Sequence, residues 1–380
     1  MNALVVATAT LVCVAVVPYL AYIILYGWLQ PSESPVQKKP REPTVSILLP
    51  TYNEERIIEQ KLVSLCELDY PAEKIEIVVA DSSDDGTATI VRDFFTDRDA
   101  PSLTLLEEGE RRGVARAIND AMKQVSGEVV FRTDCDSRLA GDAVREAVAN
   151  LADPDVAAAT GRQVEVLGDS EVEEDYRDLI ARLQSVESRL DSTFICHGPC
   201  FAFERAAFRP IAPDSLADDT EIGVSIRRGG DRVVMDPATR FVESGVSAFG
   251  ERRTRKDRRA MGLIQLLVRN RDLLGRAGRY GRIILPFNWW FMIVSPWLGV
   301  AVTALATAAA VNLLGLIGLA LPILAGLFLW LGQRDALGPL QPLHAVADAQ
   351  ISLLIAQVRL VMGDTSGTWT VDRDSREAFE

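Results

Sequence analysis

Two acidic pairs are the residues in this chain best suited to bind a metal ion. Asp134 and Asp136 follow the apolar run 129–131, and Asp218 and Asp219 lie further along the chain. Carboxylates at positions i and i+2 that leave a buried strand point to the same side of the chain. Carboxylate oxygens suit hard divalent cations, which often complete their coordination with substrate phosphates. The first pair therefore predicts a site for Mg²⁺ or Mn²⁺ that holds a diphosphate.

Alternating strands and helices are expected to position these residues. Short apolar and β-branched runs predict strands, and helical spacing of apolar residues predicts the segments between them. This alternation implies right-handed crossovers and a mainly parallel sheet covered on both faces, which is the α/β class. The expected strands are 44–50, 75–80, 103–106 and 128–132, and the expected helices are 54–68, 87–95 and 114–125.

Polar clusters follow three of the four expected strands. They occupy residues 50–55, 81–87 and 134–136. Each alone is an ordinary turn or helix-cap sequence. Because ligands bind beyond the carboxyl ends of the strands in such sheets, three clusters at one edge favour a binding site.

Two blocks of the sequence are apolar enough to lie in a membrane. No charged residue occurs in 3–28 or in 283–333, and a helix needs roughly 20 apolar residues to cross the hydrocarbon core. We expect one span in the first block and two in the second. The first block exceeds the roughly 7–15 apolar residues of a signal peptide and has no preceding basic residue, so a retained anchor is expected.

Basic residues flank the polar region between these blocks. Lys38, Lys39 and Arg41 follow the first block, and arginines concentrate in 269–282. The positive-inside rule then predicts a multi-pass protein of the cell membrane whose polar region is cytoplasmic. The expected divisions are a transmembrane helix at 1–29, a linker at 30–43, an α/β domain at 44–245, basic interfacial helices at 246–282, two transmembrane helices at 283–333, and an interfacial helix or fourth span with a polar tail at 334–380.

Charge and cysteine content exclude other classes of protein. The net charge of −13 argues against a nucleic-acid partner, which would need a basic face. Five scattered cysteines predict no disulfide framework. Cys196, His197 and Cys200 lack an obvious fourth ligand, so we expect them to be buried rather than to bind zinc.

Taken in order, these motifs resemble those of the family 2 glycosyltransferases with a GT-A, Rossmann-like fold. The likeness extends to their membrane-bound group, which is related to chitin, cellulose and hyaluronan synthases and to polyprenyl-phosphate glycosyltransferases. It covers residues 44 to about 274 and the flanking spans. The resemblance implies an enzyme that transfers a sugar from a nucleotide-sugar donor.

The resemblance also implies which residues bind the donor. Asp81 takes the position of the family's base-contacting aspartate, and Asp134 and Asp136 match its metal-binding pair. Val114 replaces a usual lysine, so a nearby arginine would supply that charge. The implied donor-binding residues are Pro50, Tyr52, Glu54, Asp81, Arg112, Arg116, Asp134, Arg258 and Arg259.

Asp219 falls on the position of the family's catalytic base. It would take the proton of an acceptor hydroxyl as the oxygen attacks the anomeric carbon, with inversion at that carbon. If the acceptor is a lipid phosphate, which is already anionic, Asp219 would position it instead. Asp218 and Asp219 are also suited to cap a helix that begins near Thr220, and the two roles are compatible.

One departure from the family bears on the product. Processive synthases carry Gln-x-x-Arg-Trp where this chain has Lys256, Arg259 and Ala260, so the tryptophan that binds the growing polymer is missing. Arg258 and Arg259 suit either a diphosphate or anionic headgroups. We therefore expect transfer to a lipid or lipid-linked glycan. A processive polysaccharide synthase and a non-catalytic nucleotide-sugar-binding membrane protein remain alternatives, and the sugar, the base and the oligomeric state are open.

Overall fold

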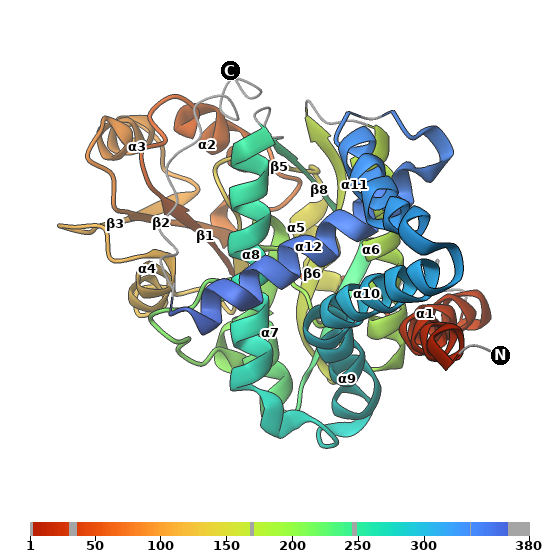
Figure 1. Cartoon of the computed structure of the whole chain (residues 1–380). Coiled ribbons are helices and arrows are strands. Elements are labelled where there is room, and N and C mark those ends of the chain that lie inside the picture. Colours follow the sequence, from red (N-terminus) through yellow and green to blue (C-terminus); the bar gives the residue numbers. More distant parts are fainter. Residues whose placement is uncertain (1–2, 30–35, 168–170, 245–248, 335, 364–380) are drawn as a thin grey trace.

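A computed structural model of the chain describes residues 3–29, 36–167, 171–244, 249–334 and 336–363. Residues 30–35 of the predicted linker and the polar tail after 363 lie outside this part. A central sheet carries helices on both faces, and a group of apolar helices lies beside it (Figure 1).

The sheet has eight strands in the order β3-β2-β1-β4-β7-β6-β8-β5. Four pairings are parallel, namely β1 with β2, β1 with β4, β2 with β3, and β6 with β8. The other three are antiparallel. The strands are β1 (Val45–Thr51), β2 (Ile75–Asp81), β3 (Ser102–Glu107), β4 (Val129–Arg132), β5 (Ser137–Leu139), β6 (Val156–Leu167), β7 (Phe201–Glu204) and β8 (Arg232–Ser244).

The predicted mainly parallel sheet is thus correct for β1 to β4 but too simple for the rest. The first four strands alternate with helices long enough to return the chain to the same edge, which makes their neighbours parallel. The second half is mixed, and β7 enters it antiparallel to β4. The sequence analysis predicted no individual strand after residue 132, and an apolar run such as 201–203 does not report the direction of a strand.

The order of the first four strands locates a binding edge. Chain order proceeds outward from β1 to β2 and β3, and then returns to β4 on the other side of β1. Ligands of open α/β sheets bind at the carboxyl ends of the strands where such a reversal occurs. Here these are the ends of β1 and β4, which lead into residues 52–55 and 133–136.

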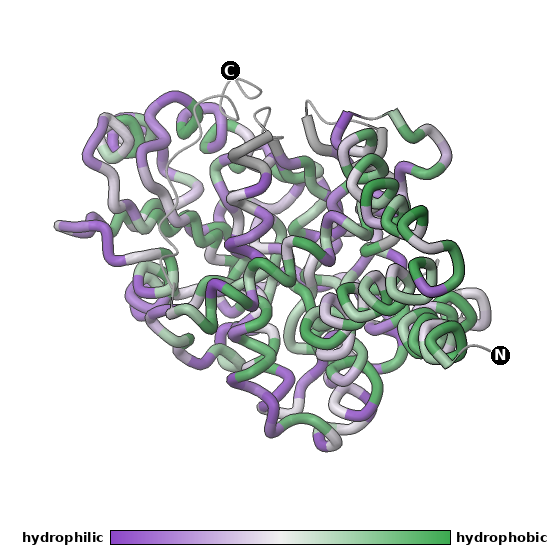
Figure 2. Tube along the Cα trace, in the orientation of Figure 1, coloured by the Kyte–Doolittle hydropathy of each residue, from purple (hydrophilic) through white to green (hydrophobic). Residues whose placement is uncertain are grey.

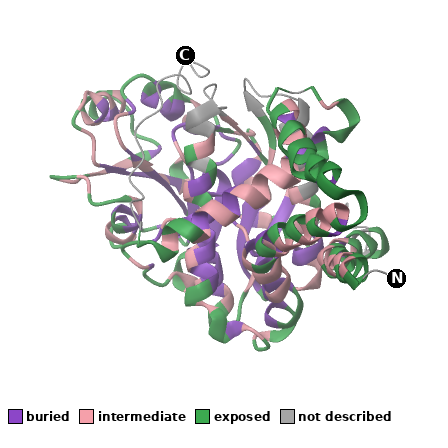
Figure 3. Ribbon diagram, viewed as in Figure 1, coloured by how far each residue is buried: buried purple, intermediate pink, exposed green. Residues whose placement is uncertain are grey.

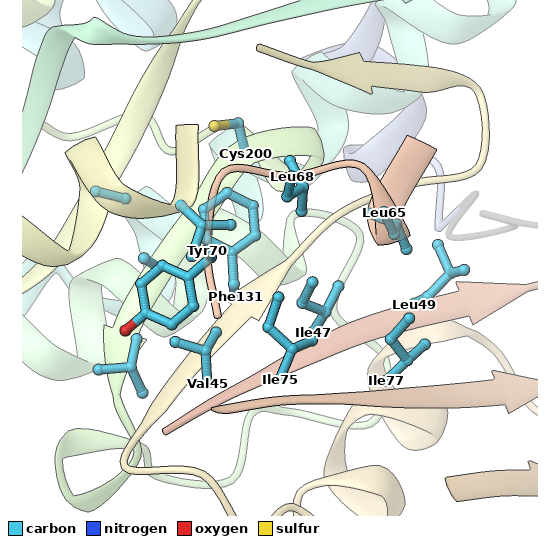
Figure 4. Packing of buried hydrophobic residues seen from close by; sticks show 14 of the residues in the cluster. Val45, Ile47, Leu49, Leu65, Leu68, Tyr70, Ile75, Ile77, Phe131 and Cys200 are labelled. Carbon is cyan, nitrogen blue, oxygen red and sulfur yellow. The ribbon is translucent and has the colours of Figure 1, made fainter. Parts of the chain in front are cut away.

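Side chains of β1 alternate between two cores. Val45, Ile47 and Leu49 face one cluster, whereas Leu48 faces the other, as the two-residue period of a strand requires. Figure 4 shows the first cluster. It is covered by α2 (Ile58–Cys66), α3 (Thr87–Phe95) and α5 (Ala143–Asn150), and the second cluster is covered by α4 (Val114–Ala121) and α7 (Asp218–Gly229).

Two of the three predicted helices are shorter in the structure than predicted, and the third has the predicted bounds. The helix expected at 54–68 spans Ile58–Cys66, and the one expected at 114–125 spans Val114–Ala121. The helix expected at 87–95 has those bounds. The backbone N–H groups of Ile57 and Ile58 both donate to the Glu54 carbonyl, so residues 54–57 form a turn before the helix.

Apolar helices form a layer at one side of the sheet. They are α1 (Ala3–Leu29), α9 (Leu285–Trp289), α10 (Ser295–Leu314) and α11 (Ala320–Gly332), with π-helical turns at Tyr280–Ile284 and Trp290–Val294. Figure 2 colours α1, α10 and α11 as largely hydrophobic, and Figure 3 shows much of α11 exposed. By length and composition, the segments Ala3–Leu25 and Tyr280–Gly332 are candidate membrane spans.

Two further helices connect this layer to the sheet domain. α8 (Phe249–Arg269) and α12 (Gln341–Val361) share a third core with the helices around Tyr280. The Arg253 guanidinium on α8 lies 2.6 Å from the Asp348 carboxylate on α12. In Figure 1, α12 crosses over α8, and α6 (Glu171–Leu190) packs against both β8 and α12.

Candidate functional site

The loop after β1 and the loop after β2 are joined at the predicted donor-binding edge. The Asp81 carboxylate ends β2 almost completely buried. Its Oδ1 accepts hydrogen bonds from the hydroxyls of Thr51 and Ser83, each at 2.5 Å. Both bonds restrict the carboxylate to one orientation, and charge-assisted bonds of this kind are the stronger class.

Further hydrogen bonds continue between the same two loops. The Asn53 backbone N–H donates to the Ser83 hydroxyl at 2.8 Å, and that of Glu54 donates to the Thr87 hydroxyl at 2.9 Å. Asn53 has a φ of 56°, a left-handed conformation that asparagine tolerates. These bonds join the two loops into one rigid unit. We call residues 51–55 and 81–87 the donor-side loops.

The other predicted donor-binding residues differ in placement. Pro50 lies in β1, and Glu54 is buried. Arg111 stacks on the Tyr52 ring, with its guanidinium carbon 3.7 Å from the ring centroid. Arg112 is exposed and pairs with Glu108 and Asp120, each at 2.8 Å. Arg116 is exposed on α4.

The loop after β4 carries the predicted metal ligands above a buried lysine. Lys61 comes from α2, and its ammonium donates to the Thr133 hydroxyl at 2.9 Å and the Ser137 carbonyl at 2.7 Å. Burial lowers the pKa of Lys61 to about 8, although Asp134 and Asp136 act in the opposite direction. The lysine therefore fixes the loop from beneath and partly balances its charge.

Arg132 links the two acidic pairs. Its Nη2 lies 3.3 Å from Asp134 Oδ1 and 2.9 Å from Asp218 Oδ2. Burial opposes the charge of this guanidinium, but the surrounding carboxylates outweigh that effect and raise its pKa. This permanent cation is thus surrounded by carboxylates. We call them the carboxylate cluster, which consists of Asp134, Asp136, Asp218 and Asp219.

Asp219 is held by backbone groups and stays partly exposed. Its Oδ2 accepts from the Gly198 N–H at 2.9 Å, and its Oδ1 accepts from the Thr220 N–H at 2.6 Å. α7 begins at Asp218, so the second acidic pair lies in its first turn. The N-cap residue is Ala217, which makes no side-chain capping bond, so the predicted capping position of the acidic pair is wrong. Asp219 instead accepts from one backbone N–H of the first turn.

His197 and Arg259 border the same region. His197 Nε2 lies 3.1 Å from Gln184 Oε1, and its Nδ1 lies 3.4 Å from Arg259 Nη2. Burial first, and then the Arg259 charge, lower the pKa of His197 to about 3, so the imidazole is neutral. Arg259 is exposed and Arg258 is half-buried on α8.

Burial raises the pKa values of two carboxylates in the cluster, Asp218 and Asp134. The pKa of Asp218 is about 6 because burial raises it, and Asp219 and Asp134 add to this against the pull of Arg132. Desolvation, followed by repulsion from Asp136 and Asp219, raises the pKa of Asp134 despite Arg132. This excess of negative charge is an environment that favours a divalent cation.

The protein alone offers few ligands to such a cation. Among the described residues, no group of three His, Cys, Asp or Glu side chains is placed to hold a metal ion. A cation on Asp134 and Asp136 would need oxygens from water or from a substrate phosphate, as Mg²⁺ often does. The residues fit a metal that binds together with its substrate.

A groove of about 550 Å³ lies elsewhere, beside α2 and β5. Its lining includes Glu59, Ser64 and Arg138, and none of the predicted site residues. The groove is therefore distinct from the carboxylate cluster.

Two residues that the sequence analysis did not select, Arg132 and Lys61, help to build the site together with Gly198. Arg132, Lys61 and Gly198 are all buried. Arg132 is the charged residue that ends the apolar run 129–131, and Lys61 interrupts the apolar face of its helix. A buried charge in such a place was the available signal, because Lys and Arg are almost never fully buried unless paired.

Two family models match the chain. The model described as "Glycosyl transferase family 2" matches residues 46–211, and "Glycosyl transferase family group 2" matches residues 129–331. The second match covers more than half of the chain and includes β4, α9, α10 and all but the last residue of α11, but not α1.

Individual proteins are similar to this chain as well. A mannosyltransferase from Pyrobaculum calidifontis, solved in complex with GDP-Man and Mn²⁺, is 31% identical with a TM-score of 0.79 and covers 95% of this chain and 99% of its own. An N-acetylglucosaminyltransferase of Rhizobium meliloti is 28% identical over 53% of this chain and 51% of its own length. A poly-β-1,6-N-acetyl-D-glucosamine synthase of Staphylococcus aureus is 25% identical over 67% of this chain and 64% of its own. The chain spans about half the length of the first curated relatives it matches.

Proposed function

This chain belongs to glycosyltransferase family 2, and on that premise we propose that it is a membrane-anchored, inverting, metal-dependent member. In this proposal it moves a sugar from a nucleotide donor to a lipid or lipid-linked glycan at the cytoplasmic face. The observation that carries the proposal is the link through Arg132 between Asp134, on the predicted metal-binding loop, and Asp218, beside the predicted base.

Asp219 is the proposed general base. Two backbone N–H groups orient its carboxylate, and it remains partly exposed. An acceptor hydroxyl has a pKa far above 7, so removal of its proton during attack lowers the barrier. Attack from the side opposite the leaving nucleotide inverts the configuration of the anomeric carbon.

Asp134 and Asp136 are the proposed metal ligands. A divalent cation there would neutralise the donor diphosphate and stabilise the charge that develops on the leaving nucleotide. Lys61 and Arg132 keep the loop in place. The mannosyltransferase solved with Mn²⁺ supports this assignment and makes GDP-Man the first donor to test.

The membrane placement rests on the apolar layer. Leu316, Ile317 and Ile323 are each more than 70% exposed in this layer, and water would disfavour so large an apolar surface. An enzyme fixed at the bilayer suits an acceptor that is confined there too. The basic residues at 38–41 and 269–282 favour a cytoplasmic site.

A single-transfer product is favoured over a polymer by Ala260. Processive synthases of the family that the motifs resemble have tryptophan at this position, whereas Ala260 is 7% exposed within the third core, which also contains Ala217 and Met261. An indole would not fit there without repacking. The similarity to a poly-β-1,6-N-acetyl-D-glucosamine synthase supports a polymer product as the alternative. The length of the product decides between a single transfer and a polymer.

To test the proposal, the full chain in lipid nanodiscs would receive GDP-Man or UDP-GlcNAc, Mn²⁺ and membrane lipid extract. Mass spectrometry is expected to find lipids that carry one added sugar, and to find none with Asp136→Asn. Asp214→Asn is the matched control, since Asp214 is exposed and pairs with Arg269. No transfer by the wild type, or full activity of Asp136→Asn, would overturn the proposal.

A further inference from the structure

Arg132 is an unusual residue to find at the end of a central strand. It ends β4 opposite Phe201 of β7 and is only 5% exposed. Taking a guanidinium out of water costs several kcal/mol unless its partners are well placed. Its Nη2 has two carboxylate partners, but Nε and Nη1 have no hydrogen-bond partner among the described residues.

The two carboxylates come from segments that are distant in the sequence. Asp134 belongs to the loop after β4, and Asp218 begins α7. One nitrogen contacts both, at 3.3 and 2.9 Å. The distance between the predicted metal loop and the helix that carries Asp219 therefore depends on this guanidinium.

Gly198 supplies the seat for the other end of the guanidinium. A Cβ added to Gly198 would lie 1.4 Å from Arg132 Nη1, so any larger residue displaces the arginine. The N–H of the same glycine donates to Asp219 Oδ2 at 2.9 Å. Gly198 thus both seats Arg132 and orients the proposed base.

We propose that Arg132, seated on Gly198, is a positioning residue that holds the metal-side loop and the start of α7 in the geometry needed for sugar transfer. This inference rests on the proposed function. Nη1 and Nε are buried, so the donor would reach them only if the loop moved. Arg132 therefore acts through Asp134, Asp218 and Gly198 rather than on the substrate.

The expected kinetic effect is on turnover rather than on donor binding. Arg132→Met should lower kcat about 100-fold, the scale of a 1 Å misplacement of catalytic groups, while the KM for the donor changes less than about threefold. Arg132→Lys keeps a charge without the fork and should recover part of kcat. Arg240→Met is the control, because Arg240 is half exposed and lies 3.5 Å from Asp142.

Gly198→Ala offers an independent way to move the guanidinium. The clash is with the far end of a flexible side chain, so the variant should fold and reproduce the low kcat of Arg132→Met. Once the arginine is gone the clash is gone, so the double variant should be no worse than Arg132→Met alone. Gly141→Ala, which has open space for a Cβ, is the matched glycine control.

Thermal unfolding of the wild type, Arg132→Met, Gly198→Ala and the double variant tests the contact between Arg132 and Gly198 without any transfer assay. A double-mutant cycle in thermal stability should show Gly198→Ala to be destabilising only when Arg132 is present. Additive stabilities, a donor KM effect without loss of kcat, or unchanged kcat in Arg132→Met would overturn the inference. Loss of wild-type transfer would overturn the proposed function instead, and the stability cycle would still decide on the seat.

Discussion

The donor-side loops and the carboxylate cluster lie at the same edge of the sheet, but different interactions hold them. Hydroxyls and backbone amides join the loops 51–55 and 81–87 through neutral or singly charged hydrogen bonds. The cluster is instead organised around two buried cations, Lys61 and Arg132. The difference indicates that the donor side tolerates single losses, whereas the cluster does not, because losing one partner leaves a buried charge uncompensated.

The largest effect is expected from the proposed base. Asp219→Asn should lower kcat about 10³-fold, because an amide cannot take the proton from the hydroxyl of the acceptor substrate. General-base catalysis contributes about 10²- to 10⁴-fold to such rates. Nucleotide affinity, measured by calorimetry with GDP, should stay within about threefold. Equal loss in Asp214→Asn, or near-normal transfer by Asp219→Asn, would contradict the assignment.

The next effect tests the buried cation beneath the metal loop. Lys61→Met removes hydrogen bonds to Thr133 and Ser137 and the charge beside Asp134. We expect a loss of about 3 kcal/mol in the free energy of unfolding. Chemical denaturation measures this loss, and Lys123→Met is the control because the Lys123 side chain is 70% exposed. A loss below about 1 kcal/mol would show that the cluster does not depend on this lysine.

A pH-dependent effect is expected outside the cluster, at the buried Glu187 of α6. Its carboxylate accepts from the Phe194 N–H at 2.9 Å and from Asn288 Nδ2 at 2.7 Å. Burial nevertheless raises its pKa from 4.5 to about 7. Between these pH values the folded protein binds a proton that the unfolded chain does not, so this group's contribution to stability falls as the pH rises.

Glu187→Gln should remove that slope. Relative to the wild type, the variant should gain about 2 kcal/mol in the free energy of unfolding as the pH rises from 4.5 to 7. Unfolding at several pH values measures the difference, with the exposed Glu165→Gln as control. A difference that does not change with pH would refute the linkage.

The smallest effect is expected on the donor side. Thr51→Val removes one hydrogen bond to Asp81, which keeps its bond from Ser83. We expect the variant to lose about 1 kcal/mol of stability or of donor affinity. A loss of donor affinity of this size raises the KM for the donor several-fold and leaves kcat unchanged. Thr89→Val, at an exposed site on α3, is the control. A collapse of activity would remove the contrast between the two regions.

The two regions also differ in what the sequence could predict. Asp81 and its neighbours lie in contiguous segments at the ends of β1 and β2, so local motifs located them and strand order explains why they meet. The cluster depends on contacts between residues such as Arg132 and Gly198, which are far apart in the chain. Hydrophobic periodicity locates strands but does not report which buried charge faces which glycine.

The second half of the sheet was hard to predict for a related reason. The pairing of β7 with β4 and β6 is antiparallel, whereas the alternating pattern before residue 132 predicted parallel neighbours. The apolar runs themselves do not report strand direction, and β6 and β7 are antiparallel although α6 lies between them in the chain. The predicted roles of Arg112 and Arg116 remain predictions, since Arg112 is held in exposed ion pairs.

The central claim is that Asp134 and Asp136 hold a divalent cation against the donor diphosphate beside Asp219. Crystals of the full chain grown with Mn²⁺ and GDP, measured at the manganese absorption edge, test it most directly. We predict an anomalous peak between the diphosphate and the two carboxylates, and no peak in Asp136→Asn crystals. Manganese bound elsewhere, or GDP bound away from this edge, would contradict the account.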